Sequence, residues 1–204
     1  IKTDRLIDRP YLLLASSHAN EEFEFLQQRP AAFQSHLIVI APRHPKRTDD
    51  IQRQLTQLGI KYAVRSLSQP ITKFTEVYLA DTLGELKQFM AHAQVVVMGG
   101  SFVQTGGHNL IEPANLGCAI ITGPSDSNIR QDIELLGQER GILQVEDMAS
   151  CWNKVDDLIQ HPAKAEALRD NARAALLKQS NVGKAYLAEI APFLSAPKKS
   201  KPTL

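Results

Sequence analysis

The sequence predicts an α/β protein, a Rossmann-like parallel sheet with helices on both faces. Short apolar runs bounded by turn residues alternate along the chain with longer stretches whose apolar residues recur every three or four positions. This alternation of buried strand and amphipathic helix is typical of a parallel sheet covered by crossover helices. The chain has 204 residues, of which 43% are hydrophobic and 22% are charged, so it can bury one continuous core without disulfides.

Seven short and mainly apolar runs are predicted to be strands. In chain order they cover residues 11–15 (YLLLA), 36–41 (HLIVIA), 61–65 (KYAVR), 76–80 (EVYLA), 94–98 (QVVVM), 118–122 (CAIIT) and 141–145 (GILQV). Continuous apolar runs of this length are expected for strands that are buried on both faces. The helices predicted between them cover residues 21–28, 48–58, 83–92, 109–116 and 128–136.

Three further helices are predicted at the end of the chain, over residues 148–160, 163–178 and 182–193. Pro162 separates the first two because proline breaks a continuing helix. We interpret residues 1–194 as one domain and residues 195–204 (SAPKKSKPTL) as a flexible basic tail. The sequence begins at Ile1 without an initiator methionine or a signal-peptide pattern, which is compatible with a segment of a longer chain.

The charge balance argues against a nucleic-acid-binding protein. The whole chain carries 23 basic and 22 acidic residues, but Lys198, Lys199 and Lys201 lie in the tail, so residues 1–194 have 20 basic and 22 acidic groups. A net charge of −2 on the folded part offers no basic footprint for a nucleic acid. The longest apolar runs, residues 37–41 and 95–98, are far shorter than the ~20 residues that cross a bilayer.

A glycine-rich loop is the most informative candidate for a ligand site. Ligands of open parallel sheets bind at the carboxyl ends of the strands, and GGSFVQTGGHNLIEP follows the predicted strand 94–98 there. Its four glycines would let the backbone approach a ligand, and the helix predicted to start near Asn109 would offer amides to a phosphate. Glu112 could bond a ribose diol or simply complement the helix dipole. His108 could touch a ligand or be satisfied by the backbone.

Other loops at the same edge have both functional and structural interpretations. The loop PRHPKR follows strand 36–41, where Arg43 could hold an anion or be solvated surface. Ser17 and His18 follow the first strand, and Glu85 could be a ligand group or a capping-box partner for Thr82. The dinucleotide, P-loop, nucleophile-elbow and zinc-protease motifs are absent, and the six histidines show no metal spacing, so no metal site is predicted.

Five segments in a fixed order resemble the carboxyl-terminal half of the 3-deoxy-D-manno-octulosonic acid (Kdo) transferases. They are SSHANEE, APRHP, VYLADTLGELKQF, VVMGGSFVQTGGHNLIEPANLG and ITGP, and the resemblance runs from about Arg9 to about Phe193. It implies the C-terminal half of a GT-B glycosyltransferase, in which two Rossmann-like domains face a cleft. It also implies inverting, metal-independent transfer of Kdo from CMP-Kdo to the lipid A precursor in lipopolysaccharide biosynthesis. The enzyme would work peripherally at the cytoplasmic face of the bacterial inner membrane, without a cofactor.

The resemblance also implies a donor site in this chain. The residues carried over to it are Pro42, Arg43, Leu83, Gly84, Glu85, Ser101, Gly106, Gly107, Asn109, Leu110, Ile111 and Glu112, with Ser17, His18 and His108 as further candidates. Glu112 would be the ribose ligand. The family's general base lies on an N-terminal acceptor domain that is absent from this chain, so no catalytic residue is assigned and the chain alone is expected to bind donor without catalysing transfer. Ala15 and Asn20 stand where the family usually has glycines.

Three other interpretations stay open at this point. The chain could be the second domain of another GT-B enzyme, such as a UDP-sugar transferase or a UDP-GlcNAc 2-epimerase, which places a glycine loop and a ribose-binding glutamate similarly. It could be a non-catalytic nucleotide-binding domain. It could also be an α/β interaction domain, which would bind no nucleotide.

Overall fold

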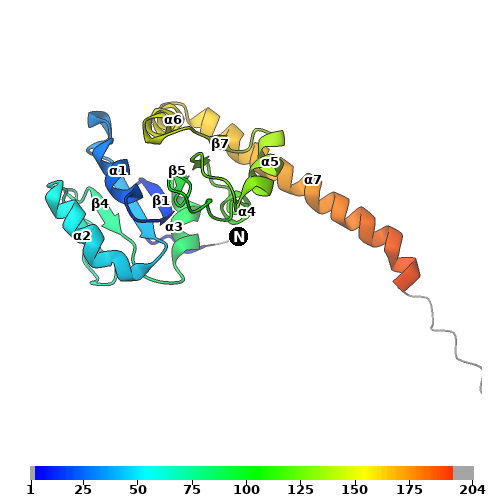
Figure 1. The fold of residues 1–204 in the computed structure, drawn as a ribbon, viewed down its shortest axis with the longest axis horizontal. Coiled ribbons are helices and arrows are strands. Elements are labelled where there is room, and N and C mark those ends of the chain that lie inside the picture. The colour runs from blue at the N-terminus through cyan, green and yellow to red at the C-terminus, as the bar shows by residue number, and fades with distance from the viewer. Residues whose placement is uncertain (1–2, 195–204) are drawn as a thin grey trace, which may run out of the picture.

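The computed structural model describes residues 3–194. They fold around one seven-stranded parallel sheet (Figure 1). The strand order is β3-β4-β2-β1-β5-β6-β7. The strands are β1 (Tyr11–Ser17), β2 (Leu37–Pro42), β3 (Tyr62–Val64), β4 (Val77–Leu79), β5 (Val95–Met98), β6 (Ile120–Thr122) and β7 (Leu143–Gln144). All seven predicted strands and the Rossmann-like class are therefore confirmed, with differences of one or two residues at most ends.

Seven α-helices accompany the strands in the described part of the chain. They are α1 (Glu21–Gln27), α2 (Thr48–Gln57), α3 (Leu86–His92), α4 (Ile111–Asn115), α5 (Arg130–Gln138), α6 (Met148–Gln160) and α7 (Pro162–Leu194), with short 3-10 turns at Ala31–Phe33 and Pro45–Arg47. The prediction of two last helices was wrong, because α7 is continuous through residues 179–181, which contain neither glycine nor proline. The predicted tail, residues 195–204, lies outside the described residues.

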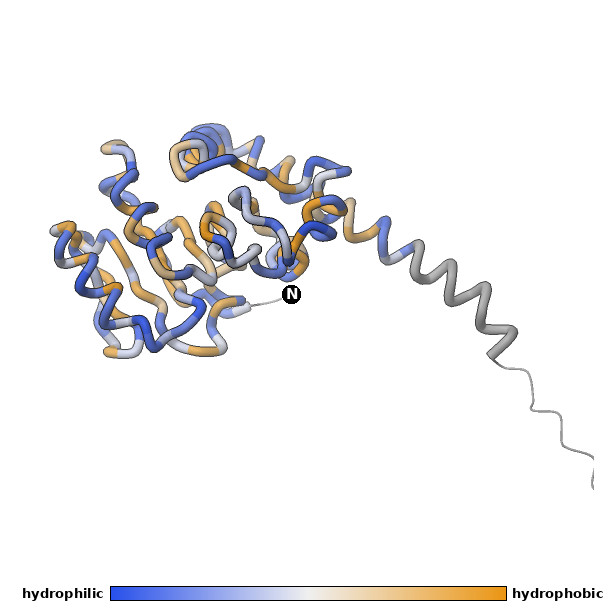
Figure 2. The backbone as a smooth tube through the Cα atoms, in the orientation of Figure 1, coloured by the Kyte–Doolittle hydropathy of each residue, from blue (hydrophilic) through white to orange (hydrophobic). Residues whose placement is uncertain are grey.

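The sheet is buried on both faces because successive side chains of each central strand point to opposite sides. Leu12 and Leu14 of β1 pack in a cluster with α1, α2 and α6, whereas Leu13 packs in a second cluster with α3, α5 and α7. Trp152 of α6 stacks on Phe25 of α1 with ring centroids 4.4 Å apart and donates to its carbonyl oxygen at 2.8 Å. In Figure 2, hydrophobic and hydrophilic segments alternate along the backbone tube.

The strand order has its switch point between β1 and β5, where successive strands begin to be added on the opposite side of β1. β1 pairs with β2 on one side and with β5 on the other, so the loops that leave β1 and β5 diverge at this point. In open parallel sheets such a switch point opens a crevice at the carboxyl ends of the strands. Among residues 3–194, no helix combines the length and apolar character needed to cross a membrane.

Candidate functional site

Two buried glutamates tie together the loops at the switch point. The Glu21 carboxylate accepts the backbone N–H groups of His18 (2.8 Å), Gly100 (2.7 Å) and Phe102 (3.0 Å), so it joins the β1 loop to the glycine-rich loop after β5. Burial raises the pKa of Glu21, and these three amides oppose that rise. The role of Glu21 could not be predicted from the sequence, because nothing local shows that amides about 80 residues away converge on it.

The second glutamate joins the β1 loop to the basic loop after β2. The Glu22 carboxylate accepts a hydrogen bond from the Ser17 hydroxyl at 2.8 Å. It also accepts hydrogen bonds from the two terminal guanidinium nitrogens of Arg47, at 2.6 and 3.0 Å. Ser17 is fully buried, so its side chain serves this contact and is not open to a ligand. Asn20, just before α1, has φ 76°, a left-handed conformation that asparagine tolerates and glycine adopts freely. This explains how asparagine can stand at a position where the resembling family usually has glycine.

Four predicted donor residues line one small hollow. Pro42 and Arg43 at the end of β2 face Leu83 and Gly84 after β4 across a cavity of about 170 Å³. Arg43 is exposed, and its backbone N–H donates to the Ser17 carbonyl at 3.0 Å, which holds the start of the basic loop against β1. The Leu83 side chain is 84% exposed at the edge of this hollow. The structure thus brings these four residues together.

Glu85 lies beside this hollow but is held by another side chain. Arg65 binds both carboxylate oxygens, at 3.0 and 2.7 Å, and the Thr82 hydroxyl donates to the same group. The Arg65 hydrogen bonds hold the pKa of Glu85 below its usual range. The helix predicted from residue 83 begins only at Leu86, because Gly84 has φ +86°, which a right-handed helix cannot include.

The glycine-rich loop packs against its own chain at three predicted positions. Ser101 is fully buried, donates to the Met98 carbonyl at 2.5 Å and accepts the Gly123 N–H at 2.8 Å. Gly106 and Gly107 have φ of +83° and +78°, and a Cβ on either would collide with residues 127–129. Turn conformation and close packing therefore account for these glycines, and their contact with a ligand stays a prediction.

The expectation that α4 offers free amides to a phosphate was wrong. The Asn109 side-chain oxygen accepts the N–H groups of Ile111 (2.8 Å) and Glu112 (3.1 Å), and Asp132 accepts the N–H of Leu110 at 2.9 Å. Because this cap occupies residues 109 and 110, the helix predicted from residue 109 starts at Ile111 and has only five residues. The Leu110 side chain is fully buried in the core, so neither its amide nor its side chain is open to a ligand.

Glu112 remains accessible on the other side of α3. Its side chain is 38% exposed and pairs with Lys87 of α3 at 3.0 Å. With Asn109 and Ile111 it lines an open hollow of about 310 Å³. Leu86 lines the first hollow and Lys87 the second, so the two hollows flank the start of α3. The roles of Arg65 and Lys87 could not be predicted from the sequence, because their pairing with acids follows from the tertiary fold.

Three histidines gather at the switch point. The Nε2 atoms of His18 and His108 are 2.8 Å apart, and His44 approaches the His18 ring edge-on with centroids 5.9 Å apart. Burial lowers the pKa of His18, and burial together with neighbouring cationic groups lowers that of His108 to about 4. In residues 3–194, no group of three or more metal-ligating side chains is arranged to hold a metal ion.

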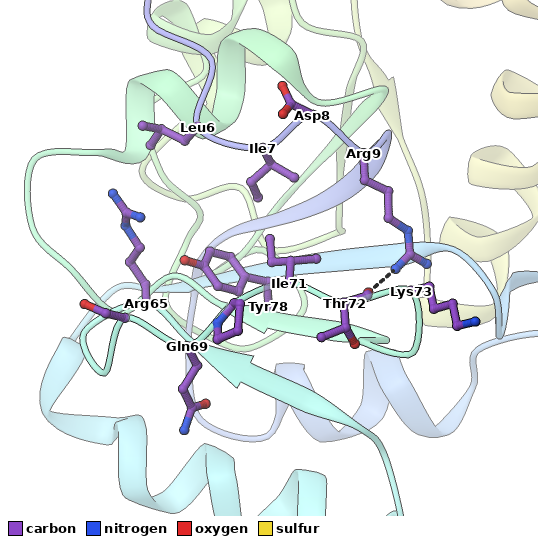
Figure 3. A pocket seen from close by; sticks show the side chains of 12 residues that line it. Leu6, Ile7, Asp8, Arg9, Arg65, Gln69, Ile71, Thr72, Lys73 and Tyr78 are labelled. Carbon is purple, nitrogen blue, oxygen red and sulfur yellow. Dashed lines mark hydrogen bonds between the residues drawn. The ribbon is translucent and has the colours of Figure 1, made fainter.

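A larger cavity, of about 570 Å³, lies away from these residues (Figure 3). Residues 65–76 connect β3 to β4 without a helix, and part of this segment lines the cavity. Ile7, Ile71 and Tyr78 line the cavity, and Arg9 crosses to the Thr72 carbonyl. None of the predicted donor residues lines it.

The sequence and the fold both have counterparts among known proteins. No family model matches the chain. The chain is 35% identical over 173 residues to the 3-deoxy-D-manno-octulosonic acid transferase of Bordetella pertussis, covering 81% of this chain and 40% of that protein. The chain therefore spans about two fifths of this relative's length.

Solved structures that match the fold include two C-terminal domains. The C-terminal CMP-Kdo binding domain of WaaA from Acinetobacter baumannii superposes with a TM-score of 0.79 at 31% identity, over 83% of this chain and 90% of that domain. The C-terminal domain of a group 1 glycosyl transferase from Francisella tularensis gives a TM-score of 0.55 at 12% identity, over 84% and 86% of the two chains, which shows the fold alone. The fold is that of the C-terminal half of a GT-B glycosyltransferase, and the chain belongs to the Kdo transferase family.

Proposed function

We propose that this chain is the donor-binding domain of a Kdo transferase and that it binds CMP-Kdo at the two hollows beside α3. The observation that carries the proposal is the 31% identity and near-complete overlap with a solved CMP-Kdo binding domain. The placement of Pro42, Arg43, Leu83 and Gly84 around one hollow supports the same location.

The first hollow suits the phosphate side of the nucleotide. Arg43 is exposed at its edge, and its guanidinium has no ion pair among the described residues, so it is available to an anion. A guanidinium can hold two phosphate oxygens at once. Arg43 would therefore stabilise the negative charge that develops as CMP leaves. Since CMP carries a single phosphate, no metal is needed to bridge a diphosphate.

The second hollow suits the sugar of the nucleotide. Glu112 presents a carboxylate there, and a carboxylate can accept two hydrogen bonds from the 2′ and 3′ hydroxyls of a ribose. Lys87 holds this carboxylate at 3.0 Å without covering it. Glu85 would contact CMP only at the side that Arg65 and Thr82 leave open.

The complete reaction requires groups beyond the described site. An inverting transfer needs a general base that takes the proton from the acceptor hydroxyl. We place that base on an N-terminal domain and the acceptor, the lipid A precursor, in the cleft between the two domains. The enzyme would act at the cytoplasmic face of the inner membrane as a peripheral protein, and the described domain alone would bind donor without transferring Kdo.

Calorimetric titration tests the nucleotide specificity directly. We expect CMP to bind the 204-residue chain and UMP to bind at least about tenfold more weakly, a difference of about 1.4 kcal/mol. Stronger binding of UMP would indicate a UDP-sugar enzyme. Absence of binding by either nucleotide would overturn the proposal and favour a domain that only contacts other proteins.

A further inference from the structure

The His18–His108 pair occupies the centre of the switch point. His18 follows β1 and His108 ends the glycine-rich loop after β5, so the pair bridges the two diverging loops. The two ring planes lie within 15° of each other and their Nε2 atoms are 2.8 Å apart. Both rings are only partly buried, so the pair remains within reach of a ligand in the crevice.

The geometry of this contact restricts its protonation. A hydrogen bond between two Nε2 atoms needs a proton on one of them and a free lone pair on the other. The pair can therefore be neutral, or it can carry one extra proton on the Nδ1 atom of the donor ring. Two imidazolium rings would place two Nε2–H groups against each other, which breaks the contact. In the described residues neither Nδ1 has a hydrogen-bond partner, so an added proton can reach it from solvent.

The charged groups around the pair are mainly cationic. The guanidinium groups of Arg43 and Arg47 face it from the loop after β2, beside the His44 ring, and Glu21 and Glu22 are the nearby acids on α1. Both acids are already engaged: Glu22 binds Ser17 and Arg47, whereas Glu21 binds backbone amides. Burial and the neighbouring cations together favour the neutral form of both rings in the free protein. An anion placed among these cations would reverse that balance.

We propose that the His18–His108 pair is an anion subsite that takes up one proton from solvent when the phosphate-bearing donor binds. This inference rests on the proposed function and adds a chemical role for two residues of the site. The charged pair would donate to the anion beside Arg43, and the proton would return to solvent when the nucleotide leaves. Binding of the anion would therefore strengthen as the pH falls through the pKa of the occupied pair.

Calorimetry in two buffers of different ionisation enthalpy measures this proton directly. CMP and cytidine are each titrated at about pH 6 into the wild-type chain and into His18→Gln and His108→Gln. The two variants keep a polar side chain, and either one suffices if the other does not fold. His161→Gln is the matched control, because His161 is exposed at the end of α6, away from the crevice.

The proposal predicts that wild type and His161→Gln take up as much as about one proton more with CMP than the pair variants do. The phosphate of CMP itself titrates near pH 6, but this contribution is shared and cancels in the difference. Cytidine lacks the anion, so all four proteins should show equal uptake with it. Across falling pH, wild-type affinity for CMP should gain up to about tenfold per pH unit over the variants.

Equal proton uptake by wild type and both pair variants with CMP would overturn the proposal while leaving CMP binding intact. A wild-type excess that is as large with cytidine would also overturn it, because the proton would then not follow the anion. Failure of CMP to bind wild type at any pH would overturn the proposed function together with this inference.

Discussion

The carboxyl edge of the sheet contains two regions that use acidic and basic residues in opposite ways. In the inner region, Glu21 and Glu22 are fully buried, and their carboxylates accept hydrogen bonds from amides, a hydroxyl and a guanidinium of the same chain. On the outer rim, Arg43 is exposed and Glu112 is more than a third exposed beside a hollow. The difference shows that two adjacent glutamates can serve only to hold loops in place. A charged side chain that stays accessible beside a hollow is instead a candidate for ligand binding.

The largest expected effect is a loss of stability caused by a substitution in the inner region. Glu22→Ala leaves the Arg47 guanidinium, which is mostly buried, without its partner. Removing one member of a buried ion pair typically costs about 3 kcal/mol or more. We therefore expect urea unfolding to show a loss of this size in the free energy of unfolding. Glu139→Ala, which breaks the exposed pair with Lys178, should cost less than about 1 kcal/mol. Equal losses for the two variants would contradict the assignment of Glu22 to the architecture.

The second largest expected effect is a loss of activity when Arg43 on the outer rim is replaced. In the intact enzyme, Arg43→Ala should lower kcat about a hundredfold, because it removes a group that stabilises charge on the departing phosphate. The free energy of unfolding should stay nearly unchanged, since the side chain has no ion pair among residues 3–194. Arg53→Ala, on the exposed face of α2, is the control and should leave kcat unaltered. A loss confined to acceptor affinity would refute this role.

A smaller effect separates the two hollows. Glu112→Gln should weaken CMP binding about tenfold, because a neutral amide accepts less strongly from the ribose hydroxyls. Wild type should prefer CMP over its 2′-deoxy analogue, and Glu112→Gln should lose most of that preference. Calorimetry of both ligands with both proteins measures the coupling. An unchanged preference in the variant would place the ribose elsewhere.

The smallest expected effect concerns Glu85, which is partly exposed like the rim residues but is paired within the chain like the inner glutamates. Arg65 holds its pKa below the usual range, so the pair stabilises the fold above the unfolded pKa of about 4.3 and loses this contribution as the pH falls through the folded pKa. The contribution should stay below about 1 kcal/mol because the groups are partly exposed. The stability difference between wild type and Glu85→Gln should therefore shrink on acidification. A difference that is constant with pH would exclude this linkage.

The fold could be predicted from the sequence because each strand corresponds to a local apolar run, and each helix to a local stretch in which apolar residues recur every three or four positions. The errors fall where local signals are weak. Residues 179–181 give no helix signal strong enough to reveal that α7 is continuous, and Gly84 delays the start of α3 through a conformation that composition does not show. Strand order likewise depends on pairing between segments far apart in the chain.

The site could be predicted only in part. The resemblance to the Kdo transferases supplied Pro42, Arg43, Leu83 and Gly84, which the structure brings to one hollow. The capture of the Leu110 amide by Asp132 could not be foreseen, because it joins residues on two separate elements. The pairing of Arg65 with Glu85 was hidden for the same reason. Hydrogen bonds between distant segments decide which polar groups stay free for a ligand.

Nuclear magnetic resonance of the isotope-labelled chain shows whether the outer rim beside α3 holds cytidine monophosphate. Addition of CMP should shift the backbone amide signals of Arg43, Gly84 and Glu112, and leave those of Ile7 and Tyr78 in the larger cavity unchanged. Shifts confined to that cavity, or no shifts at saturating nucleotide, would contradict the account.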